Sequence, residues 1–462
     1  MFEESKKTAA MLGEDDLREL AEQLVGRATK AGASDAVASI SEGDEFSVTV
    51  RMGEVETLEE SGSRSLGLRV YEGQRSASAS TSDLTPDGLN QLLASVMDLV
   101  KITEPDRFSG LADAEEMGVF GGDLHLCFED VYALPVPERI EMARRAEAAA
   151  LSADVRIRNS AGATFSAATA RRILANSRGF SGEYRSSHCG VSVVPIAVDE
   201  KGAMQRDSWW SSARRLSDLE SAQSVGAEAA RRAVRMLGAR RVATQQVPIV
   251  FAPEAARTLL GHLFEAASGD AIWRSASFLA GRLDETIAAS ALTLVDDHTL
   301  VLANGSGGFG SRPFDGDGLP ARRTTVVKDG VLETWLLNVY AARKLKMRST
   351  GNAAGGGIGA GNLFLLPGMS SPDAIVRSVS RGLYVTSVMG FGVNLVTGDY
   401  SRGASGLWIE NGELTHAVEE ITIAGNLGEI FRNVVAVGSD LEFRGSVASP
   451  TLLVEGMTIA GA

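Results

Sequence analysis

The chain has 462 residues, of which 44% are hydrophobic and 23% are charged, a composition typical of an ordinary globular protein with two or three domains. Its formal net charge is -14, and no run of Lys or Arg is long enough to follow a phosphate backbone, which argues against direct nucleic-acid binding. No window reaches the ~18 apolar residues of a membrane span and the charged N-terminus lacks a signal-peptide core, so we expect a cytoplasmic protein without membrane attachment.

The two cysteines, Cys127 and Cys189, are too far apart in sequence for a CxxC pair, and they form neither a disulfide framework nor a cysteine-rich metal module. This cysteine usage is consistent with a reducing cytosol. The five histidines are equally scattered, and no two of them have the spacing that would place both on one face of a helix.

The N-terminal part of the sequence begins with a loose lead-in over residues 1–14, and a helix follows it. Residues 15–30 place leucines and alanines on one face, with Asp15 and Asp16 at the positive end of the helix dipole. Five short runs with strand character follow, separated by Gly43, Gly53, Gly62 and Gly73, and this spacing predicts an antiparallel meander. The runs are 36–41, 45–52, 55–60, 65–71 and 75–81.

Three further helices and at least two long strands are expected before residue 240. Thr85 is a cap followed by Pro86 at the first helical position, which starts a helix that runs to residue 100. Helices are also predicted over 137–153 and 218–237, and strands over 155–175, 179–198 and 204–211. We place a domain boundary after residue 240.

The second half of the chain is richer in strands. Lys328-Asp329-Gly330 and Glu410-Asn411-Gly412 are strong hairpin turns. Short helices are predicted over 338–345 and 371–380, and strands over 246–251, 292–295, 322–327, 331–337, 382–388, 407–410 and 451–454. The expected fold class is α+β, with an N-terminal antiparallel sheet backed by helices (residues 1–240) and a C-terminal, mostly antiparallel β domain (residues 241–462).

A helix that begins at Pro253 carries candidate functional residues. His262 and Glu265 are three positions apart, so they project from neighbouring positions on one side of this helix and are candidate metal ligands. A catalytic zinc needs three protein ligands, and a zincin helix supplies two histidines with a glutamate between them. The alternative is that His262 and Glu265 hydrogen-bond to each other or to water at a helix surface. We therefore assign no catalytic residue.

Two glycine-rich stretches and one acidic triplet partly resemble ligand-binding motifs. Residues 304–310, NGSGGFG, and 355–361, GGGIGAG, lack the Lys-Ser/Thr ending of a phosphate loop, so flexible loops at the rim of a cavity are expected. Asp296, Asp297 and His298 together could bind a cation. A turn with solvated carboxylates is the more common outcome for such a triplet.

The segment from Asp399 to Gly406 supplies candidate contacts with a substrate or a partner. Ser401 lies beside Arg402, but no His or Asp at a fixed spacing supports a serine nucleophile. If Arg402 faces a cavity, its guanidinium can hold a peptide carboxylate or an acidic group of a partner. A structural ion pair between Arg402 and Asp399 is the alternative.

Several stretches of the second half form a recognisable set. They are SASFLAGRL at 275–283, FDGDGLPARRTTVVKDGVLETWLL at 314–337, STGNA at 349–353, MGFGVNLVTGDYSRGASGLWIEN at 389–411 and ITIAGN at 421–426. Together they resemble the TldD/PmbA family, and most closely its PmbA branch, which is also called TldE. The resemblance is strongest over residues 246–458 and continues in the same order over residues 15–240.

The resemblance implies one half of a paired cytoplasmic peptidase. In such a pair, a TldD-type subunit holds a metal through an HExxxH helix and a ligand near its C-terminus, and a TldE-type subunit associates with it. The pair encloses a cavity where unfolded peptides are cleaved, as in microcin maturation and antitoxin breakdown. Here the HExxxH position reads Gly261 to Glu265 without the second histidine, and Asp440 to Pro450 contains no Cys or His.

We therefore expect a non-catalytic TldE-like subunit, without a cofactor of its own, that docks onto a zinc-bearing TldD-like partner and helps to select unfolded peptides. Two alternatives stay open. One is an independent metallohydrolase with a divergent site around His262, Glu265 and Asp296, and the other is a binding protein that modulates a topoisomerase. The apolar surface that pairing needs is also consistent with a homodimer of the isolated chain.

Overall fold

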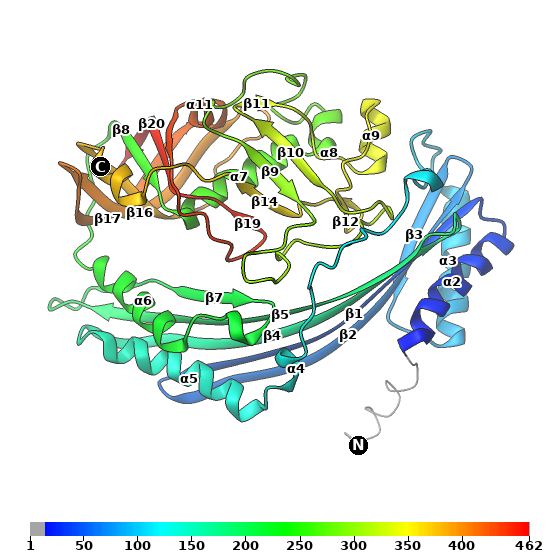
Figure 1. The fold of residues 1–462 in the computed structure, drawn as a ribbon, viewed down its shortest axis with the longest axis horizontal. Coiled ribbons are helices and arrows are strands. Elements are labelled where there is room, and N and C mark those ends of the chain that lie inside the picture. Colours follow the sequence, from blue (N-terminus) through cyan, green and yellow to red (C-terminus); the bar gives the residue numbers. More distant parts are fainter. Residues whose placement is uncertain (1–13, 462) are drawn as a thin grey trace.

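The structure, a computed structural model, describes residues 14–461, and the expected lead-in lies outside this range except for Glu14. The chain folds into two bodies (Figure 1). The first is a long, curved antiparallel sheet with helices on its outer face. The second half of the chain forms a β-rich body that lies over the inner face of this sheet. This arrangement confirms the predicted α+β class.

The first sheet is seven-stranded, in the order β3-β2-β1-β4-β5-β6, and β7 pairs with β5. Its strands are β1 (Asp35–Arg51), β2 (Glu54–Glu72), β3 (Arg75–Thr81), β4 (Ile157–Asn176), β5 (Ser181–Val198), β6 (Met204–Arg206) and β7 (Trp209–Ala213). The strand breaks predicted at Gly43 and Gly62 were wrong, because β1 and β2 continue through them. A Cβ atom on Gly43 would lie 2.7 Å from the carbonyl oxygen of Thr169, so this glycine permits close approach of β4 instead of a turn.

Two separate helix pairs cover the outer face of this sheet. α2 (Glu14–Lys30) and α3 (Pro86–Ile102) pack on the half that contains β3, and α5 (Val136–Ala153) and α6 (Ala222–Arg235) pack on the other half. The apolar alternation of β1 is interrupted over residues 41–45, SEGDE, which divides its buried side chains into two groups. A single sheet therefore carries two cores, and the four helices predicted for this half of the chain are confirmed.

Charged side chains fill the gap between the two cores. Glu42 of β1 forms ion pairs with Arg64 of β2 and with Arg171 of β4. Arg171, which is only 7% exposed, also places Nε 2.6 Å from the carboxylate of Glu183 on β5. Opposite charges on neighbouring strands thus support the register of the sheet where apolar contacts are missing.

A connecting segment, residues 103–128, crosses from the first core to the second and contacts the C-terminal body. Arg343 donates hydrogen bonds to the carbonyl oxygens of Phe108, Gly110 and Leu111. The segment therefore lies against α9 (Val339–Leu345), a helix of the C-terminal body that carries Arg343. The N-terminal half also contains the short helices η1 (Ala114–Glu116), α4 (Asp130–Ala133) and η2 (Leu216–Asp218).

Two main sheets form the C-terminal body. The larger runs β17-β16-β15-β8-β20-β18, and β17 also pairs with β20, which closes it into a barrel; the smaller runs β11-β10-β9-β14-β19. The strand predicted over 331–337 was too long. The Leu336 amide instead donates a hydrogen bond to the carbonyl oxygen of Ala267, the last residue of helix α7 (Pro253–Ala267). The strands are β8 (Gln245–Phe251), β9 (Leu294–Asp297), β10 (Arg323–Lys328), β11 (Val331–Leu332), β12 (Ala353–Ala354), β13 (Gly357–Ile358), β14 (Asn362–Leu365), β15 (Arg381–Met389), β16 (Asp399–Glu410), β17 (Glu413–Asn426), β18 (Val434–Val437), β19 (Val447–Ala448) and β20 (Leu452–Ala460).

Both predicted hairpin turns are confirmed. Asp329 and Gly330 have φ angles of 47° and 82°, and Asn411 and Gly412 have φ angles of 55° and 79°, as two-residue hairpin loops require. They join β10 to β11 and β16 to β17. The second hairpin is much longer than expected, because only residues 407–410 of it were predicted as strand.

Helix α7 (Pro253–Ala267) lies inside the C-terminal body and positions the candidate site. Its buried side chains follow one helical stripe and join the largest apolar cluster among the described residues, together with strands of both sheets. The other face of α7 carries His262 and Glu265. The remaining helices are α8 (Gly269–Trp273), α10 (Pro372–Arg377) and α11 (Leu427–Arg432). Within residues 14–461, no helix combines the length and the apolarity needed to cross a lipid bilayer.

The glycine-rich stretch 304–310 lies between the two bodies. Its residues line a hollow of about 310 Å³, as expected for a cavity rim. The stretch is nevertheless held firmly, which corrects the expectation of a flexible loop. Arg214 of the N-terminal domain donates hydrogen bonds to the carbonyl oxygens of Gly307 and Gly308, and a Cβ atom on Gly310 would lie 2.2 Å from the backbone of Gly361 in the second glycine-rich stretch.

Candidate functional site

His262 and Glu265 lie on the face of α7 that is turned away from the apolar cluster. Nδ1 of His262 is 3.6 Å from a carboxylate oxygen of Glu265, and the two side chains are 18% and 57% exposed. Their spacing of about one helical turn brings them together, as the sequence indicated. The pair therefore lies at the protein surface, within reach of solvent and of a docked molecule.

The second ring nitrogen of His262 faces a cation. Arg402 on β16 places Nη1 3.1 Å from Nε2 of His262, and its Nε donates a hydrogen bond of 3.1 Å to the carbonyl oxygen of Met389. A guanidinium cannot accept, so Nε2 accepts this hydrogen bond and the imidazole is neutral. Burial lowers the pKa of His262; the carboxylate of Glu265 acts in the opposite direction, and Arg402 lowers the pKa further.

Tyr400 lies next to this pair in the interior. Its ring meets the imidazole of His262 edge-on, with the ring centroids 6.2 Å apart, and the side chain is 1% exposed. The Tyr400 hydroxyl has no hydrogen-bond partner among the described residues. Burial raises the pKa of Tyr400 to about 12, against the opposing effect of Arg402, so the hydroxyl stays protonated at neutral pH.

These residues do not fit a bound metal ion. The Nε2 lone pair of His262 faces the Arg402 guanidinium, whose positive charge would repel a divalent cation at the same position. Among residues 14–461, no group of three or more His, Cys, Asp or Glu side chains is arranged to hold a metal ion. A catalytic zinc needs three protein ligands. We therefore derive no metal-dependent step at this site.

Asp399, Ser401 and Arg402 do not share one face of β16. Side chains alternate along a strand, so Asp399 and Ser401 point one way and Arg402 points the other. Asp399 accepts a hydrogen bond of 2.7 Å from the hydroxyl of Thr397, and both Asp399 and Ser401 are exposed. The alternative of an ion pair between Arg402 and Asp399 was therefore wrong. Of the three predicted contact residues, Arg402 is the one that reaches His262.

The acidic triplet 296–298 is buried in a polar network, not solvated in a turn. Asp296 and His298 are 0% and 1% exposed. Oδ2 of Asp296 lies 2.9 Å from Nε2 of His298 and accepts a hydrogen bond of 2.6 Å from Asn352. Within residues 14–461, no hydrogen bond or ion pair links Asp296 to His262, so the structure does not assemble the divergent site considered for an independent hydrolase.

Sequence reasoning missed Tyr400 and Asn352 as parts of these two clusters. Asn352 is completely buried and donates hydrogen bonds to Asp296 and to the carbonyl oxygen of Gly359. Both residues lie in stretches that carried the family resemblance, STGNA and residues 389–411. That membership was the signal that could have singled them out.

Three family models match successive parts of the chain. They describe domain 1, the central domain and the C-terminal domain of PmbA/TldA metallopeptidases, and they cover residues 36–100, 129–237 and 244–461. The chain belongs to the PmbA/TldD family. The metalloprotease PmbA of Escherichia coli O157:H7 is 39% identical over 96% of this chain and 97% of its own length. A metalloprotease PmbA homolog of Haemophilus influenzae is 36% identical, with 97% of each chain covered.

Solved structures related to this PmbA/TldD-family chain have the same fold. A Bacteroides thetaiotaomicron protein described as a putative modulator of DNA gyrase has a TM-score of 0.90 and 28% identity, with 98% of this chain and 100% of that chain covered. TldE from Thermococcus kodakarensis has a TM-score of 0.85 and 19% identity, with 96% and 100% covered. The similarity to TldE is one of fold, and the relatives named PmbA support the PmbA branch.

Proposed function

We propose that this PmbA/TldD-family chain is the non-catalytic, metal-free subunit of a heterodimeric cytoplasmic metallopeptidase. Its partner is a TldD-like subunit that carries zinc, and the pair cleaves unfolded or leader peptides. The observation that supports the proposal is the contact between Arg402 and Nε2 of His262, because a cation lies where a metal would have to bind the imidazole. Since its relatives are described as metalloproteases, the activity would need a second chain that supplies the metal.

In this proposal, the surface around His262 meets the partner and the peptide. Glu265 and Arg402 supply one negative and one positive group, which suits polar contacts with an extended peptide or with the other subunit. Met389, the last residue of β15, accepts a hydrogen bond from Arg402 through its carbonyl oxygen, and Phe391 follows two positions later. Their side chains are 59% and 102% exposed. Exposed apolar side chains of this size are common at protein interfaces.

The first test is the zinc content of the chain purified alone, after exposure to zinc and removal of the excess. We expect far less than one zinc per chain, because no third ligand joins His262 and Glu265 among the described residues and Arg402 lies against Nε2. The TldD-like subunit, treated in the same way, is the positive control. About one tightly held zinc per copy of this chain would overturn the proposal.

The second test combines the two subunits and follows the cleavage of an unfolded peptide. We expect a heterodimer by size-exclusion chromatography and cleavage only by the mixture. His262→Ala in this chain should leave measurable cleavage, whereas loss of the HExxxH histidines of the partner should abolish it. If the isolated chain cleaved the peptide and His262→Ala abolished that cleavage, the chain would instead be an independent hydrolase.

A further inference from the structure

The first half of β2 is a free edge of the long sheet. β1 pairs with β2 along its whole length, but β3 pairs with β2 only over Leu66–Glu72. Among the described strands, none pairs with the outer side of residues 54–65. Residues 54–63 are all exposed. We call residues 54–65 the free edge.

A free edge offers the hydrogen bonds of a further strand. Along its outer side, alternate residues of β2 direct backbone N–H and C=O groups away from the sheet, where they can pair with an extended peptide. At about 3.3 Å per residue, residues 54–65 give enough length for an added strand of about ten residues. The free edge can therefore bind extended polypeptide without rearrangement of the sheet.

The free edge and the adjoining part of β1 carry unpaired negative charge. Arg51 forms an ion pair with Glu56 and Arg64 forms one with Glu42. Arg144 of α5 reaches the end of the hairpin, where its Nε donates a hydrogen bond to the carbonyl oxygen of Gly53. Four carboxylates form no ion pair or side-chain hydrogen bond with any described residue: Glu45, Glu54, Glu59 and Glu60. The charge of the free edge is thus suited to a basic partner and not to an acidic one.

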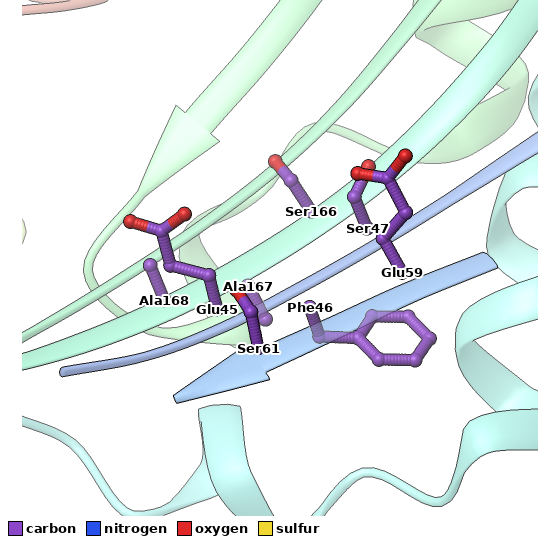
Figure 2. Close-up of a pocket in the computed structure, with 8 residues that line it drawn as sticks. All are labelled: Glu45, Phe46, Ser47, Glu59, Ser61, Ser166, Ala167 and Ala168. Atoms are coloured by element: carbon purple, nitrogen blue, oxygen red, sulfur yellow. The ribbon is translucent and has the colours of Figure 1, made fainter. Parts of the chain in front are cut away.

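Two of these carboxylates border a shallow hollow on the inner face of the sheet. Figure 2 shows Glu45 and Glu59 on the side of the sheet opposite to Phe46, whose ring belongs to the core under α5 and α6. In the β1–β2 ladder, Ser61 lies opposite Glu45 and Ser47 lies opposite Glu59. The hollow has a volume of about 150 Å³, and these short serine side chains leave room for longer ones.

We propose that the free edge binds an extended basic peptide, which adds to the sheet beside β2. Lys or Arg side chains at alternate positions of the peptide then point to the inner face. One of these basic side chains meets Glu59 on the neighbouring strand β2. The next basic side chain passes over Ser61 of β2 and points towards Glu45 of β1. Glu45 lies two strand spacings, about 10 Å, from the peptide backbone. This inference rests on the proposed function, a subunit that handles unfolded peptides, and it names the class of peptide.

A second copy of this chain fits the free edge poorly. Pairing two free edges would bring their unpaired carboxylates together, and like charges on neighbouring strands destabilise the pairing. A basic peptide instead neutralises Glu45 and Glu59, and the net charge of -14 adds attraction at longer range.

The experiment measures binding of a fluorescein-labelled peptide of alternating Lys and Thr to the full chain by fluorescence anisotropy at low ionic strength. We expect saturable binding, and no binding when Glu replaces Lys. A Lys-Thr peptide with alternate amides N-methylated keeps its charge but loses its strand hydrogen bonds, and should bind about tenfold more weakly. The double variant Glu45→Gln/Glu59→Gln should weaken binding of the alternating peptide about fivefold.

The control variant is Glu413→Gln/Glu455→Gln, which removes the same charge from two exposed positions of the C-terminal body and should leave binding unchanged. Equal affinities of the two double variants, or equal affinities for the methylated and unmethylated peptides, would overturn the inference. Hydrogen exchange should show protection of residues 54–65 when peptide is added. If residues 54–65 were protected without peptide, and this protection rose with protein concentration, a second copy of the chain would occupy the edge. That result would also overturn the inference.

Binding is measured on this chain alone, without a partner and without cleavage. A failure to form a heterodimer would therefore refute the proposed function and leave the peptide measurement intact. Conversely, a heterodimer that cleaves peptides, together with a free edge that binds none, would refute only the inference about the edge.

Discussion

His262 has a charged neighbour at each of its ring nitrogens, Glu265 at Nδ1 and Arg402 at Nε2. Burial and Arg402 favour the neutral imidazole, and Glu265 favours the charged one; the pKa falls below its ordinary value of 6.5. With Nε2 accepting from Arg402, the ring proton is on Nδ1, directed to Glu265. The histidine therefore joins a carboxylate to a guanidinium and has no lone pair left for a metal.

Substitution of the two neighbours should move the pKa of His262 in opposite directions. Arg402→Met removes a nearby positive charge and should raise this pKa, whereas Glu265→Gln removes a negative charge and should lower it. NMR titration of the imidazole protons in both variants and in the unmodified protein measures the shifts. Shifts of the same sign in the two variants would contradict the geometry.

The same pKa shift has a consequence for stability. Because the pKa of His262 is lower in the folded state than its ordinary value of 6.5, unfolding takes up a proton as the pH falls below that value. The neutral histidine contributes fully to stability above pH 6.5. This contribution is lost as the pH falls from 6.5 through the lower pKa that His262 has in the folded protein. His262→Gln should reduce the dependence of the free energy of unfolding on pH in this window, as measured by urea unfolding at a series of pH values.

At the scale of elements, the glycine-rich stretches are sites of close backbone contact. A side chain on Gly310 would overlap the backbone of Gly361, and the Gly310 amide donates a hydrogen bond to the side chain of Asn362. Glycine is needed here because two chain segments meet without space for a Cβ atom. Only the tip of the second stretch, Gly355 and Gly356, is exposed.

Gly310→Ala should lower the free energy of unfolding by about 2 kcal/mol, because the added methyl group forces the two backbones apart. Urea unfolding followed by circular dichroism measures the effect. Gly445→Ala is the matched control. Apart from Gly445 itself and its two chain neighbours, no described residue has an atom within 4 Å of the position of its Cβ atom, so little change is expected. Equal stability of the two variants would show that the stretch is looser than the structure indicates.

At the scale of the whole molecule, Arg214 joins the long sheet to the C-terminal body. It is 5% exposed and donates hydrogen bonds to the carbonyl oxygens of Gly307, Gly308 and Phe309 on one side and of Leu126 on the other. Burial lowers the pKa of Arg214 to about 10, so the side chain remains a cation at neutral pH. One buried cation thus satisfies carbonyl groups from two distant segments.

Arg214→Met should lower the free energy of unfolding by about 3 kcal/mol, because it leaves several buried carbonyl groups without a donor. Arg158→Met is the control, since Arg158 is exposed on the same sheet. Differential scanning calorimetry of both variants is the measurement. Two separate unfolding transitions in Arg214→Met would show in addition that this contact couples the unfolding of the two bodies. A melting temperature of Arg214→Met equal to that of Arg158→Met would refute the role assigned to Arg214.

Local patterns in the sequence were sufficient for most helices, for the hairpin turns at Asp329-Gly330 and Asn411-Gly412, and for the α+β class. Helical periodicity, caps and left-handed turn residues act over a few neighbouring positions, so they can be recognised without the fold. The motif stretches were likewise enough to indicate the family. The candidate pair His262 and Glu265 was predictable for the same reason, because both residues lie on one helix.

Only the tertiary structure decided what surrounds these elements. Arg402 reaches His262 from a strand 140 positions away in sequence, and the buried acidic triplet is hydrogen-bonded to Asn352. Gly43 continues a strand, with the backbone of β4 close to it. The free edge of β2 likewise exists because β3 is too short to cover it. These features depend on contacts between distant segments, and local propensity contains no information about which segments will meet or how closely their backbones approach.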